Sequence, residues 1–302
     1  MISVVVPSYN EEENISAAAR AICRALEGVQ EYELIFVDDG SHDQTWKRIV
    51  EASEEDSRIR GLRLSRNFGK EAAIRAGLEA ASGEAVILID CDLQHPPSAI
   101  PEMIKRWSDG AEVVEGKKTY RGRESKPYGF LAGIFNAMMS KITGLDMSGA
   151  SDFMLLDRKA VDAVLSYGEK GSFFRSLAQY VGFETTAVYY EVGERERGKS
   201  KFTFGKLFRA ALEDLSSFTA VPLFVSLFAG VLTALAAVVL LILGGFGVTL
   251  GSFSAAAAVL MLIGGLILLA LGAVGYYLAR IYEEVKRRPR YIISRDTGSK
   301  GK

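Results

Sequence analysis

The sequence is poor in cysteine and has no surplus of basic side chains. Its only cysteines, Cys23 and Cys91, are too few for a disulfide framework and suit a reducing compartment. The 36 basic and 37 acidic side chains give a net charge of −1, whereas a general nucleic-acid binder carries a clear basic surplus. The first residues lack the basic start and the cleavage site of a signal peptide. We therefore expect neither a nucleic-acid partner nor a signal peptide.

Charge is also missing from one long stretch of the chain. The 65 residues from Leu215 to Ala279 contain no Asp, Glu, Lys or Arg. One bilayer crossing needs only roughly 20 apolar residues. Two apolar runs, 221–243 and 255–279, are separated by a glycine-rich, weakly polar turn. This pattern predicts a transmembrane hairpin at 219–279; the alternative is a pair of buried helices in a soluble core.

Basic residues flank this hairpin on both sides and are absent from its turn. The positive-inside rule then places both termini in the cytoplasm, which predicts a multi-pass protein of the inner (plasma) membrane. Residues 202–218 mix charged residues with apolar ones spaced by three and four. This spacing predicts an interfacial amphipathic helix or, alternatively, a helix packed on the soluble domain. The tail, 280–302, is expected to be basic and cytoplasmic, with residues 296–302 disordered.

Residues 1–201 alternate between short apolar runs and helical patterns. The runs predict strands at 2–6, 33–37, 59–64 and 85–89, and the patterns between them predict helices at 13–26, 45–55 and 70–81. Short apolar strands separated by helices are typical of a parallel α/β sheet with both faces covered. Ligands of such sheets bind at the carboxyl ends of the strands. We therefore expect a cytoplasmic α/β domain with its site at this edge.

Acidic and amide side chains follow three of the predicted strands. They stand in the segments 7–12 (Pro-Ser-Tyr-Asn-Glu-Glu), 38–41 (Asp-Asp-Gly-Ser) and 90–94 (Asp-Cys-Asp-Leu-Gln). A cluster this acidic repels a phosphate by itself, but it binds Mg²⁺ or Mn²⁺, and the metal then neutralises a diphosphate. In an Asp-x-Asp pattern after a strand, both carboxylates point to one side. The pattern predicts a metal-dependent diphosphate site.

Four motifs of this chain are also found together in a known family. They are Pro-Ser-Tyr-Asn-Glu (7–11), Val-Asp-Asp-Gly-Ser (37–41), Arg-Asn-Phe-Gly-Lys (66–70) and Asp-Cys-Asp-Leu-Gln-His-Pro-Pro (90–97). With them, nearly the whole chain resembles the family 2 glycosyltransferases with the GT-A fold. It is most similar to the polyprenyl-phosphate branch, which includes dolichol-phosphate mannose synthases and bactoprenol glucosyltransferases. The resemblance implies a Rossmann-like nucleotide-sugar domain followed by the interfacial helix and the two-helix hairpin.

The resemblance implies roles for the residues on the donor side. Asp90 would contact the ribose and diphosphate, and Asp92 with Gln94 would hold the metal. Lys70 would add positive charge near the donor, or else be a solvated residue in the first turn of its helix. The rest of the nucleotide pocket would consist of Pro7, Tyr9, Asn10, Glu11 and Asp39, with Asp38 close by.

The resemblance implies acceptor residues in two basic segments. Residues 194–202 match a family pattern, Arg-x-x-Gly-x-Ser-Lys-aromatic, in which Arg195, Ser200 and Lys201 would bind the acceptor phosphate. The alternative is a polybasic patch that attracts anionic lipids. In the second segment, 117–126, Lys118 stands where relatives have a phosphate-binding arginine, and a lysine offers no bidentate fork.

Three aspartates, Asp90, Asp92 and Asp152, are the expected catalytic residues. Asp152 matches an acidic position of the bacterial branch. It is expected to orient the acceptor or the sugar rather than to remove a proton, because an acceptor phosphate is already ionised. His95 is either a metal ligand or a structural residue, and Cys91 is expected to be a small core residue that points away from its neighbours.

The implied activity is transfer of a hexose, glucose from UDP-glucose in the leading interpretation, to undecaprenyl or another polyprenyl phosphate. The reaction would use Mg²⁺ or Mn²⁺ and invert the anomeric centre. The alternatives are an enzyme like the dolichyl-phosphate mannose synthases that uses GDP-mannose, and a non-catalytic membrane scaffold that retains a nucleotide-binding fold. The predicted partners are thus a nucleotide sugar, a polyprenyl phosphate and the bilayer, and the resemblance leaves room for a homo-oligomer such as a tetramer.

Overall fold

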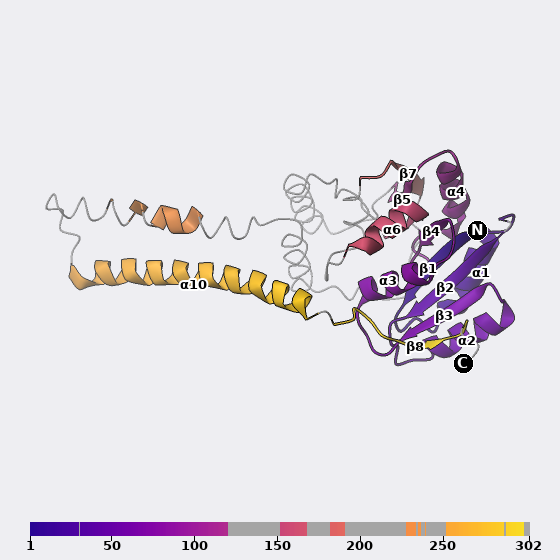
Figure 1. The fold of residues 1–302 in the computed structure, drawn as a ribbon, viewed down its shortest axis with the longest axis horizontal. Helices are drawn as coiled ribbons and strands as arrows, with labels where there is room; N and C mark the ends of the chain where they lie inside the picture. The colour runs from indigo at the N-terminus through magenta and orange to yellow at the C-terminus, as the bar shows by residue number, and fades with distance from the viewer. Residues whose placement is uncertain are drawn as a thin grey trace. The chain divides into compact units, whose positions relative to one another are not determined.

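The computed structural model describes residues 1–29, 31–119, 152–167, 182–190, 228–233, 235–236, 239, 252–286 and 288–298 (Figure 1). The chain divides into two compact units. The first unit comprises residues 1–202 together with 289–302, and the second comprises residues 203–288.

A mixed β-sheet forms the centre of the first unit. Its strands are β1 (Ile2–Ser8), β2 (Tyr32–Asp38), β3 (Ile59–Leu64), β4 (Ala85–Leu88), β5 (Val113–Lys118), β6 (Met154–Asp157), β7 (Thr185–Tyr190) and β8 (Ile293–Asp296). Their order across the sheet is β7-β5-β6-β4-β1-β2-β3-β8. Strands β1 to β4 run parallel, and β5 runs parallel to β7. Strand β6 is antiparallel to β4 and β5, and β8 is antiparallel to β3.

Helices cover both faces of this sheet. They are α1 (Ile15–Ala25), α2 (Thr45–Glu55), α3 (Lys70–Ala80), α4 (Ile100–Ser108), which follows the short helix η1 (Pro97–Ala99), and α6 (Arg158–Ser166). Because successive strand residues point to opposite faces, Val4 and Val6 of β1 pack with α1, α2 and α4, whereas Val5 packs with α3 and α6. All three valines are fully buried. Burial on both faces explains why these strands are continuous apolar runs.

Helix α3 packs very closely on the sheet. A Cβ atom at Gly77 would lie 2.2 Å from Cγ1 of Val5 and 3.2 Å from Cγ2 of Val37. Only a glycine therefore allows α3 to approach β1 and β2 at this distance. The close approach fixes the N-terminal end of α3, which begins at Lys70 at the carboxyl edge of the sheet.

The elements predicted for the first 90 residues are confirmed. Helix α2 and strand β3 have the predicted limits, and the limits of the other elements differ by two residues at most. The four predicted strands are parallel, as expected, but the complete sheet is mixed, since β6 and β8 are antiparallel. Parallel sheets commonly carry an antiparallel strand of this kind.

The prediction of a disordered tail is wrong for residues 296–298. Asp296 ends β8 and forms an ion pair with Arg60, at 2.7 Å between the nearest atoms. The backbone N–H of Thr297 donates to the carbonyl oxygen of Gly61 at 2.9 Å, and its hydroxyl oxygen accepts from the N–H of Gly61 at 2.8 Å. The physical reason is the edge of β3, whose backbone groups would otherwise lack partners in the sheet.

The described part of the second unit is mainly one long helix, α10 (Ser252–Val285). Its segment Leu262–Ala279 is long and apolar enough to cross a membrane, and none of that segment is buried; no other described helix meets this criterion. The predicted second span, 255–279, lies within α10. Most of the first span, 221–243, and all of the helix predicted at 202–218 lie outside the described residues. The two-span hairpin and the interfacial helix therefore stay predictions.

Candidate active site

A cavity of about 350 Å³ opens where strands β1, β2 and β4 end. Its wall is formed by the last residues of β1, by residues that follow these three strands, and by residues before and within the first turn of α3. The predicted site residues in the wall are Pro7, Tyr9, Glu11, Asp39, Lys70, Asp90 and Asp92. Segments far apart in the sequence thus meet in one cavity, because the carboxyl ends of parallel strands share one edge of the sheet.

Asp39 lies in the wall of the cavity but is only 3% exposed. Its carboxylate accepts hydrogen bonds from the backbone N–H groups of Phe68 and Gly69, at 2.7 and 2.8 Å. Burial raises the pKa of this carboxyl above its ordinary value, although these two hydrogen bonds act in the opposite direction. Asp39 therefore holds the turn that leads into α3.

Gly40 makes this arrangement of Asp39 and the following turn sterically feasible. A Cβ atom at Gly40 would lie 2.4 Å from the backbone carbonyl carbon of Arg66, and the φ angle of +68° is one that other residues rarely adopt. The glycine thus lets the turn after β2 contact the turn before α3.

Lys70 bridges two carboxylates at the N-terminal end of α3. Its Nζ atom lies 2.6 Å from Oδ1 of Asp90 and 2.6 Å from Oδ2 of Asp152. Desolvation disfavours the charge on Lys70, but the two carboxylates outweigh it and raise the pKa of the ammonium group. The side chain is 41% exposed, so solvent screens part of this attraction. Through Lys70, Asp152 lies beside the cavity, although it does not line it.

His95 contacts Asp90 from the buried side. The imidazole is 7% exposed, its Nε2 atom is 3.7 Å from Oδ2 of Asp90, and its Nδ1 atom is 2.6 Å from the hydroxyl oxygen of Tyr190. The ring also stacks on Phe153, with 5.4 Å between the centroids. Of the two interpretations of His95, this packing favours the structural one, in which the ring positions Asp90.

Asp92 also lines the cavity, but its contacts differ from those of Asp90. Its Oδ1 atom accepts from the backbone N–H of Gln94 at 3.1 Å, and within the described ranges no cationic side chain pairs with it. Leu93, with φ of +56°, makes the tight turn that this bond requires. Gln94 itself does not line the cavity, and its contact with Asp92 is through its backbone N–H.

The carboxylate of Asp92 fits a divalent cation that takes few of its ligands from the protein. The described residues contain no group of three or more His, Cys, Asp or Glu that could hold a metal ion by themselves. Mg²⁺, however, commonly takes only one or two carboxylates and completes its coordination with substrate phosphates and water. A carboxylate without a cationic partner, in the wall of a cavity, is a suitable ligand of this kind. Neighbouring Cys91 is 2% exposed, and burial raises the pKa of its thiol, which keeps the thiol neutral.

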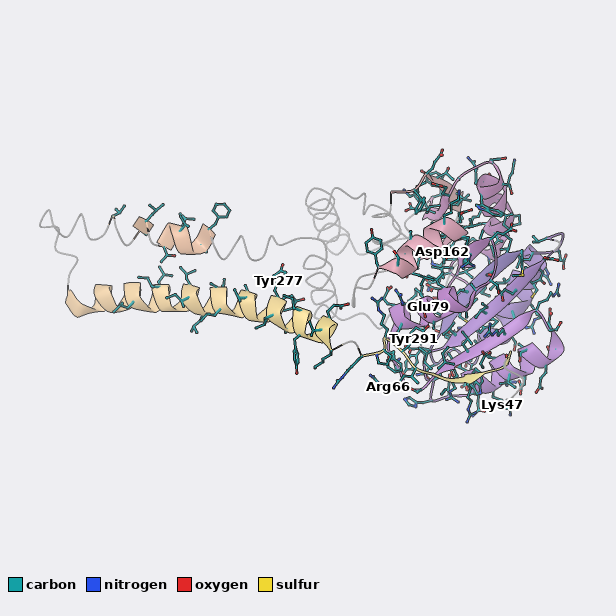
Figure 2. The ribbon with its side chains drawn as sticks, in the orientation of Figure 1. Lys47, Arg66, Glu79, Asp162, Tyr277 and Tyr291 are labelled. Atoms are coloured by element: carbon teal, nitrogen blue, oxygen red, sulfur yellow. The ribbon has the colours of Figure 1, made fainter. Side chains whose placement is uncertain are left out.

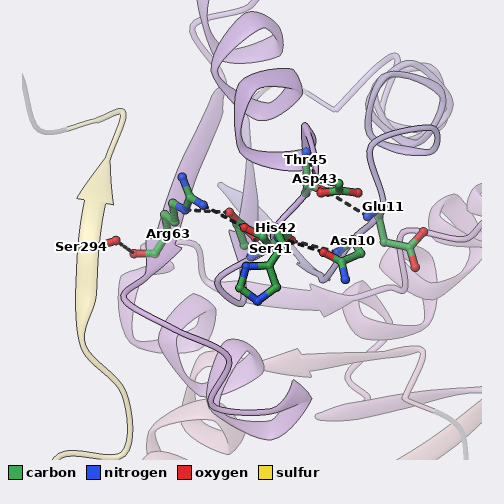
Figure 3. A network of polar contacts seen from close by, with 9 residues as sticks. Asn10, Glu11, Ser41, His42, Asp43, Thr45, Arg63 and Ser294 are labelled. Carbon is green, nitrogen blue, oxygen red and sulfur yellow. Dashed lines mark hydrogen bonds and ion pairs between the residues drawn. The ribbon is translucent and has the colours of Figure 1, made fainter.

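Two predicted pocket residues, Asn10 and Asp38, do not line the cavity but bond to the turn after β2; Figure 3 shows the contacts of Asn10. Asn10 Oδ1 accepts from the backbone N–H of His42 at 3.0 Å, and the Asn10 N–H donates to Ser41 Oγ at 2.9 Å. Asp38 is fully buried, and its Oδ1 atom accepts from the backbone N–H of Ser41 at 2.8 Å. These residues therefore shape the loops of the site instead of lining the cavity.

Arg63 contacts the turn after β2, and the sequence interpretation did not identify it. Its Nε atom lies 3.2 Å from Oδ2 of buried Asp38, and its Nη2 atom donates to the carbonyl oxygen of Ser41 at 2.9 Å. The signal was present in the sequence, because Arg60 and Arg63 interrupt an otherwise buried apolar strand. A charged residue in such a strand needs a partner or an edge position.

The predicted acceptor residues are described less fully. Arg195, Ser200 and Lys201 lie outside the described residues. Lys118 ends strand β5, and only its backbone is described. Their predicted contacts with an acceptor therefore stay predictions.

Comparison with known proteins adds to this geometry. Residues 3–165 match the family described as glycosyl transferase family 2. A prophage-derived bactoprenol glucosyl transferase of Shigella flexneri is 35% identical over 302 residues, which cover 97% of each chain. The putative glycosyltransferase CsbB of Bacillus subtilis is 37% identical over 300 residues, covering 97% of this chain and 91% of the relative.

A solved structure shares the fold. It is a glucosyl-3-phosphoglycerate synthase from Mycobacterium tuberculosis in complex with Mn²⁺ and UDP-glucose. It superposes with a TM-score of 0.53 at 21% identity, and the match covers 70% of this chain and 75% of the other. At this identity the match establishes a GT-A-like mixed α/β fold and nothing more.

Proposed function

Since the chain belongs to glycosyl transferase family 2 and is a glycosyltransferase, we propose that it transfers glucose from UDP-glucose to a polyprenyl phosphate at a membrane surface. The observation that carries this proposal is the convergence of Asp39, Asp90 and Asp92 with Lys70 in one cavity at the strand ends. The full-length similarity to bactoprenol glucosyl transferases supports the acceptor class and the sugar.

On the donor side, the nucleotide occupies the cavity beside Pro7 and Tyr9, and its diphosphate reaches the carboxylates after β4. Asp92, with Gln94 close by, would hold Mg²⁺ or Mn²⁺, and Asp90 would contact the ribose and the diphosphate. A bound cation would supply positive charge to the anionic diphosphate. Support for this arrangement comes from the described geometry, in which Asp92 lacks a cationic partner among the described side chains.

At the reacting centre, Asp152 orients the sugar or the acceptor, and Lys70 holds Asp152 next to Asp90. A phosphate oxygen of the acceptor forms a bond to the anomeric carbon while the bond from that carbon to the UDP oxygen breaks. One in-line displacement of this kind inverts the anomeric configuration. No strong base is needed, because the acceptor phosphate is already ionised.

On the acceptor side, the lipid remains in the bilayer while its phosphate meets Arg195, Ser200, Lys201 and Lys118. The segment Leu262–Ala279 of α10 provides a membrane anchor within the hairpin predicted at 219–279, which follows the predicted interfacial helix at 202–218 in the sequence. The catalytic unit faces the cytoplasm at the inner membrane, where the enzyme assembles as a homo-oligomer such as a tetramer. The flanking basic residues support this orientation.

The test uses the full-length protein in detergent with a short polyprenyl phosphate, a panel of UDP- and GDP-sugars, and Mg²⁺, Mn²⁺ or a chelator. We expect a lipid-linked glucose from UDP-glucose and a loss of product with the chelator. Asp92→Ala should lower the transfer rate by roughly 100-fold or more, as removal of a metal ligand does, while the circular dichroism stays unchanged.

The matched control for Asp92→Ala is Asp162→Asn on α6, whose side chain is 65% exposed (Figure 2). This variant should transfer glucose at the rate of the unmodified protein. Transfer at the unmodified rate by Asp92→Ala would contradict the metal assignment. A product from GDP-mannose alone would replace the proposed donor, and the absence of a lipid product with every donor would contradict the acceptor class.

A further inference from the structure

Strand β8 lies on the edge of the sheet next to β3, and it comes from the far end of the chain. We propose that β8 and Arg63 form a brace that positions the nucleotide-binding turn after β2, so that the segment following α10 is part of the donor site. The inference rests on the proposed function in one respect, namely that the cavity binds a nucleotide.

The first step is the attachment of β8 to β3. Asp296 accepts two hydrogen bonds from Arg60, from Nε at 3.0 Å and from Nη2 at 2.7 Å, in the bidentate geometry that gives strong ion pairs. Thr297 adds the two hydrogen bonds to the backbone of Gly61 described above. The Ser65 N–H also donates to the carbonyl oxygen of Ile292 at 2.8 Å. Contacts on both sides of Arg63 thus fix the backbone of β3.

The second step is the position of Arg63 itself. The hydroxyl group of Ser294 donates to the carbonyl oxygen of Arg63 at 3.1 Å. Arg63 is opposite Arg295 in the ladder, and the register shifts between Arg63 and Leu64. Irregularities of this kind redirect a side chain away from the regular alternation. The pairing with β8 therefore sets the direction in which the Arg63 side chain points from the strand.

The third step leads from Arg63 to the turn. Its guanidinium group contacts the buried carboxylate of Asp38 and the carbonyl oxygen of Ser41, the two ends of the turn. Within the part of the chain that the structure describes, Arg63 is the cation paired with Asp38. A buried carboxylate without such a partner is strongly destabilising. The geometry of the turn therefore depends on the position of Arg63.

The fourth step connects the turn to the cavity. Ser41 and His42 bond to Asn10, and Figure 3 shows this path from Ser294 through Arg63 to Asn10. Asn10 lies between Tyr9 and Glu11, which line the cavity, and Asp39 within the turn lines it as well. A shift of Arg63 would therefore move both loops that form the nucleotide side of the cavity.

The chain leading to β8 is anchored before the strand begins. Only residues 286–292 separate the end of α10 from the start of β8. Within them, the hydroxyl group of Tyr291 donates to Glu79 of α3 (Figure 2), and Nη2 of Arg290 donates to the carbonyl oxygen of Tyr167 at 3.4 Å. The chain beyond the apolar helix thus contributes to the donor site, and nucleotide affinity should depend on it.

The experiment compares three variants of the full-length protein in detergent. Asp296→Arg places like charges together and should detach β8, whereas the swap Arg60→Asp/Asp296→Arg restores the pair in reverse. The control is Asp56→Arg, which breaks the comparable bidentate pair between Asp56 and Arg58 just before β3, away from β8. Hydrogen exchange at the amides of Gly61 and Thr297 reports whether β8 is attached.

For Asp296→Arg we expect faster exchange at the Ser41 and His42 amides and a Kd for UDP raised by about tenfold or more. The KM for the polyprenyl phosphate should not change. The swap should return both quantities to within roughly threefold of the unmodified protein, as coupled residues do in a mutant cycle. The control should leave the Ser41 and His42 amides and the Kd unchanged.

Suppose that the Gly61 and Thr297 amides show that β8 has detached. If exchange at the Ser41 and His42 amides is then unchanged, the proposed brace is wrong. That readout needs no nucleotide. If the unmodified protein fails to bind UDP, the proposed function fails, while the exchange data still decide the brace. If Asp296→Arg does not fold, Ser294→Ala replaces it, since it removes one hydrogen bond to Arg63 and leaves the ion pair intact.

Discussion

Replacement of Lys70 by methionine tests the carboxylate bridge at the centre of the site. Methionine keeps an unbranched side chain of similar length but removes the ammonium group. The oxygens of Asp90 and Asp152 that now contact Lys70 are each 2.6 Å from the same nitrogen. They are therefore at most about 5 Å apart, and two unit charges at that separation repel by roughly 3 kcal/mol at an effective dielectric constant of about 20.

The measured effect should be smaller than this repulsion. The side chains of Lys70, Asp90 and Asp152 are 41%, 27% and 22% exposed, so solvent screens the charges and the carboxylates can move apart. We expect a net loss of about 1.4–2.7 kcal/mol in transition-state stabilisation, which is roughly 10- to 100-fold in kcat/KM. Lys70→Arg keeps the charge and should lose less.

The assay is the initial rate of glucose transfer at varied donor and acceptor concentrations, with thermal unfolding as the control for folding. The Lys70→Met/Asp152→Asn double variant tests whether Lys70 acts through Asp152. Residues in contact show non-additive effects, so the double variant should lose less than the product of the two single losses. The reasoning would be refuted if Lys70→Met kept the kcat/KM of the unmodified protein for both substrates. Strictly multiplicative losses in the double variant would refute it as well.

Three further predictions concern the packing and the loops. Gly77→Ala should destabilise the fold by about 1–3 kcal/mol in urea unfolding, because its Cβ would overlap Val5, and adding Val5→Ala should recover part of that loss. Gly40→Ala should weaken UDP binding in titration calorimetry, since its Cβ would lie 2.4 Å from a backbone carbon at a φ of +68°. Burial raises the pKa of the Asp43 carboxyl, but hydrogen bonds from Thr45 and from a backbone N–H outweigh it, and the pKa lies below its ordinary value of 3.8. The stability from this group is thus present above pH 3.8 and disappears as the pH falls through the lower folded-state value, so Asp43→Asn should reduce stability at pH 7 more than at pH 3 in urea unfolding.

The first half of the catalytic unit could be predicted because its signals are local. Strands β1, β2 and β3 are apolar runs that end at turn residues, and α2 has apolar residues at helical spacing. The convergence of the acidic segments followed from one rule on parallel strands. No local signal of this kind exists for β8, whose four residues include Arg295 and Asp296. Its Asp296 pairs with Arg60, which lies 236 positions earlier in the sequence.

The site shows a second limit of motif reasoning. Asp38 and Asp39 are adjacent in one motif, and the resemblance implies a pocket role for both. Strand geometry separates them, because consecutive side chains at the end of β2 point in opposite directions. Asp39 lines the cavity, whereas Asp38 is fully buried against Arg63. A motif therefore predicts where a segment lies, while the backbone decides which of its side chains reaches the ligand.

Compensation of charge explains how so many carboxylates can share one small region. Asp38 is paired with Arg63, and Asp39 accepts two backbone hydrogen bonds. Lys70 neutralises part of the charge of the two aspartates that it bridges. Among the described side chains no cation does the same for Asp92, which faces the cavity. A carboxylate in this state repels an anionic diphosphate, and an added positive charge at this position would offset that repulsion. The pairing of the other carboxylates thus supports the proposal that a cation binds beside Asp92.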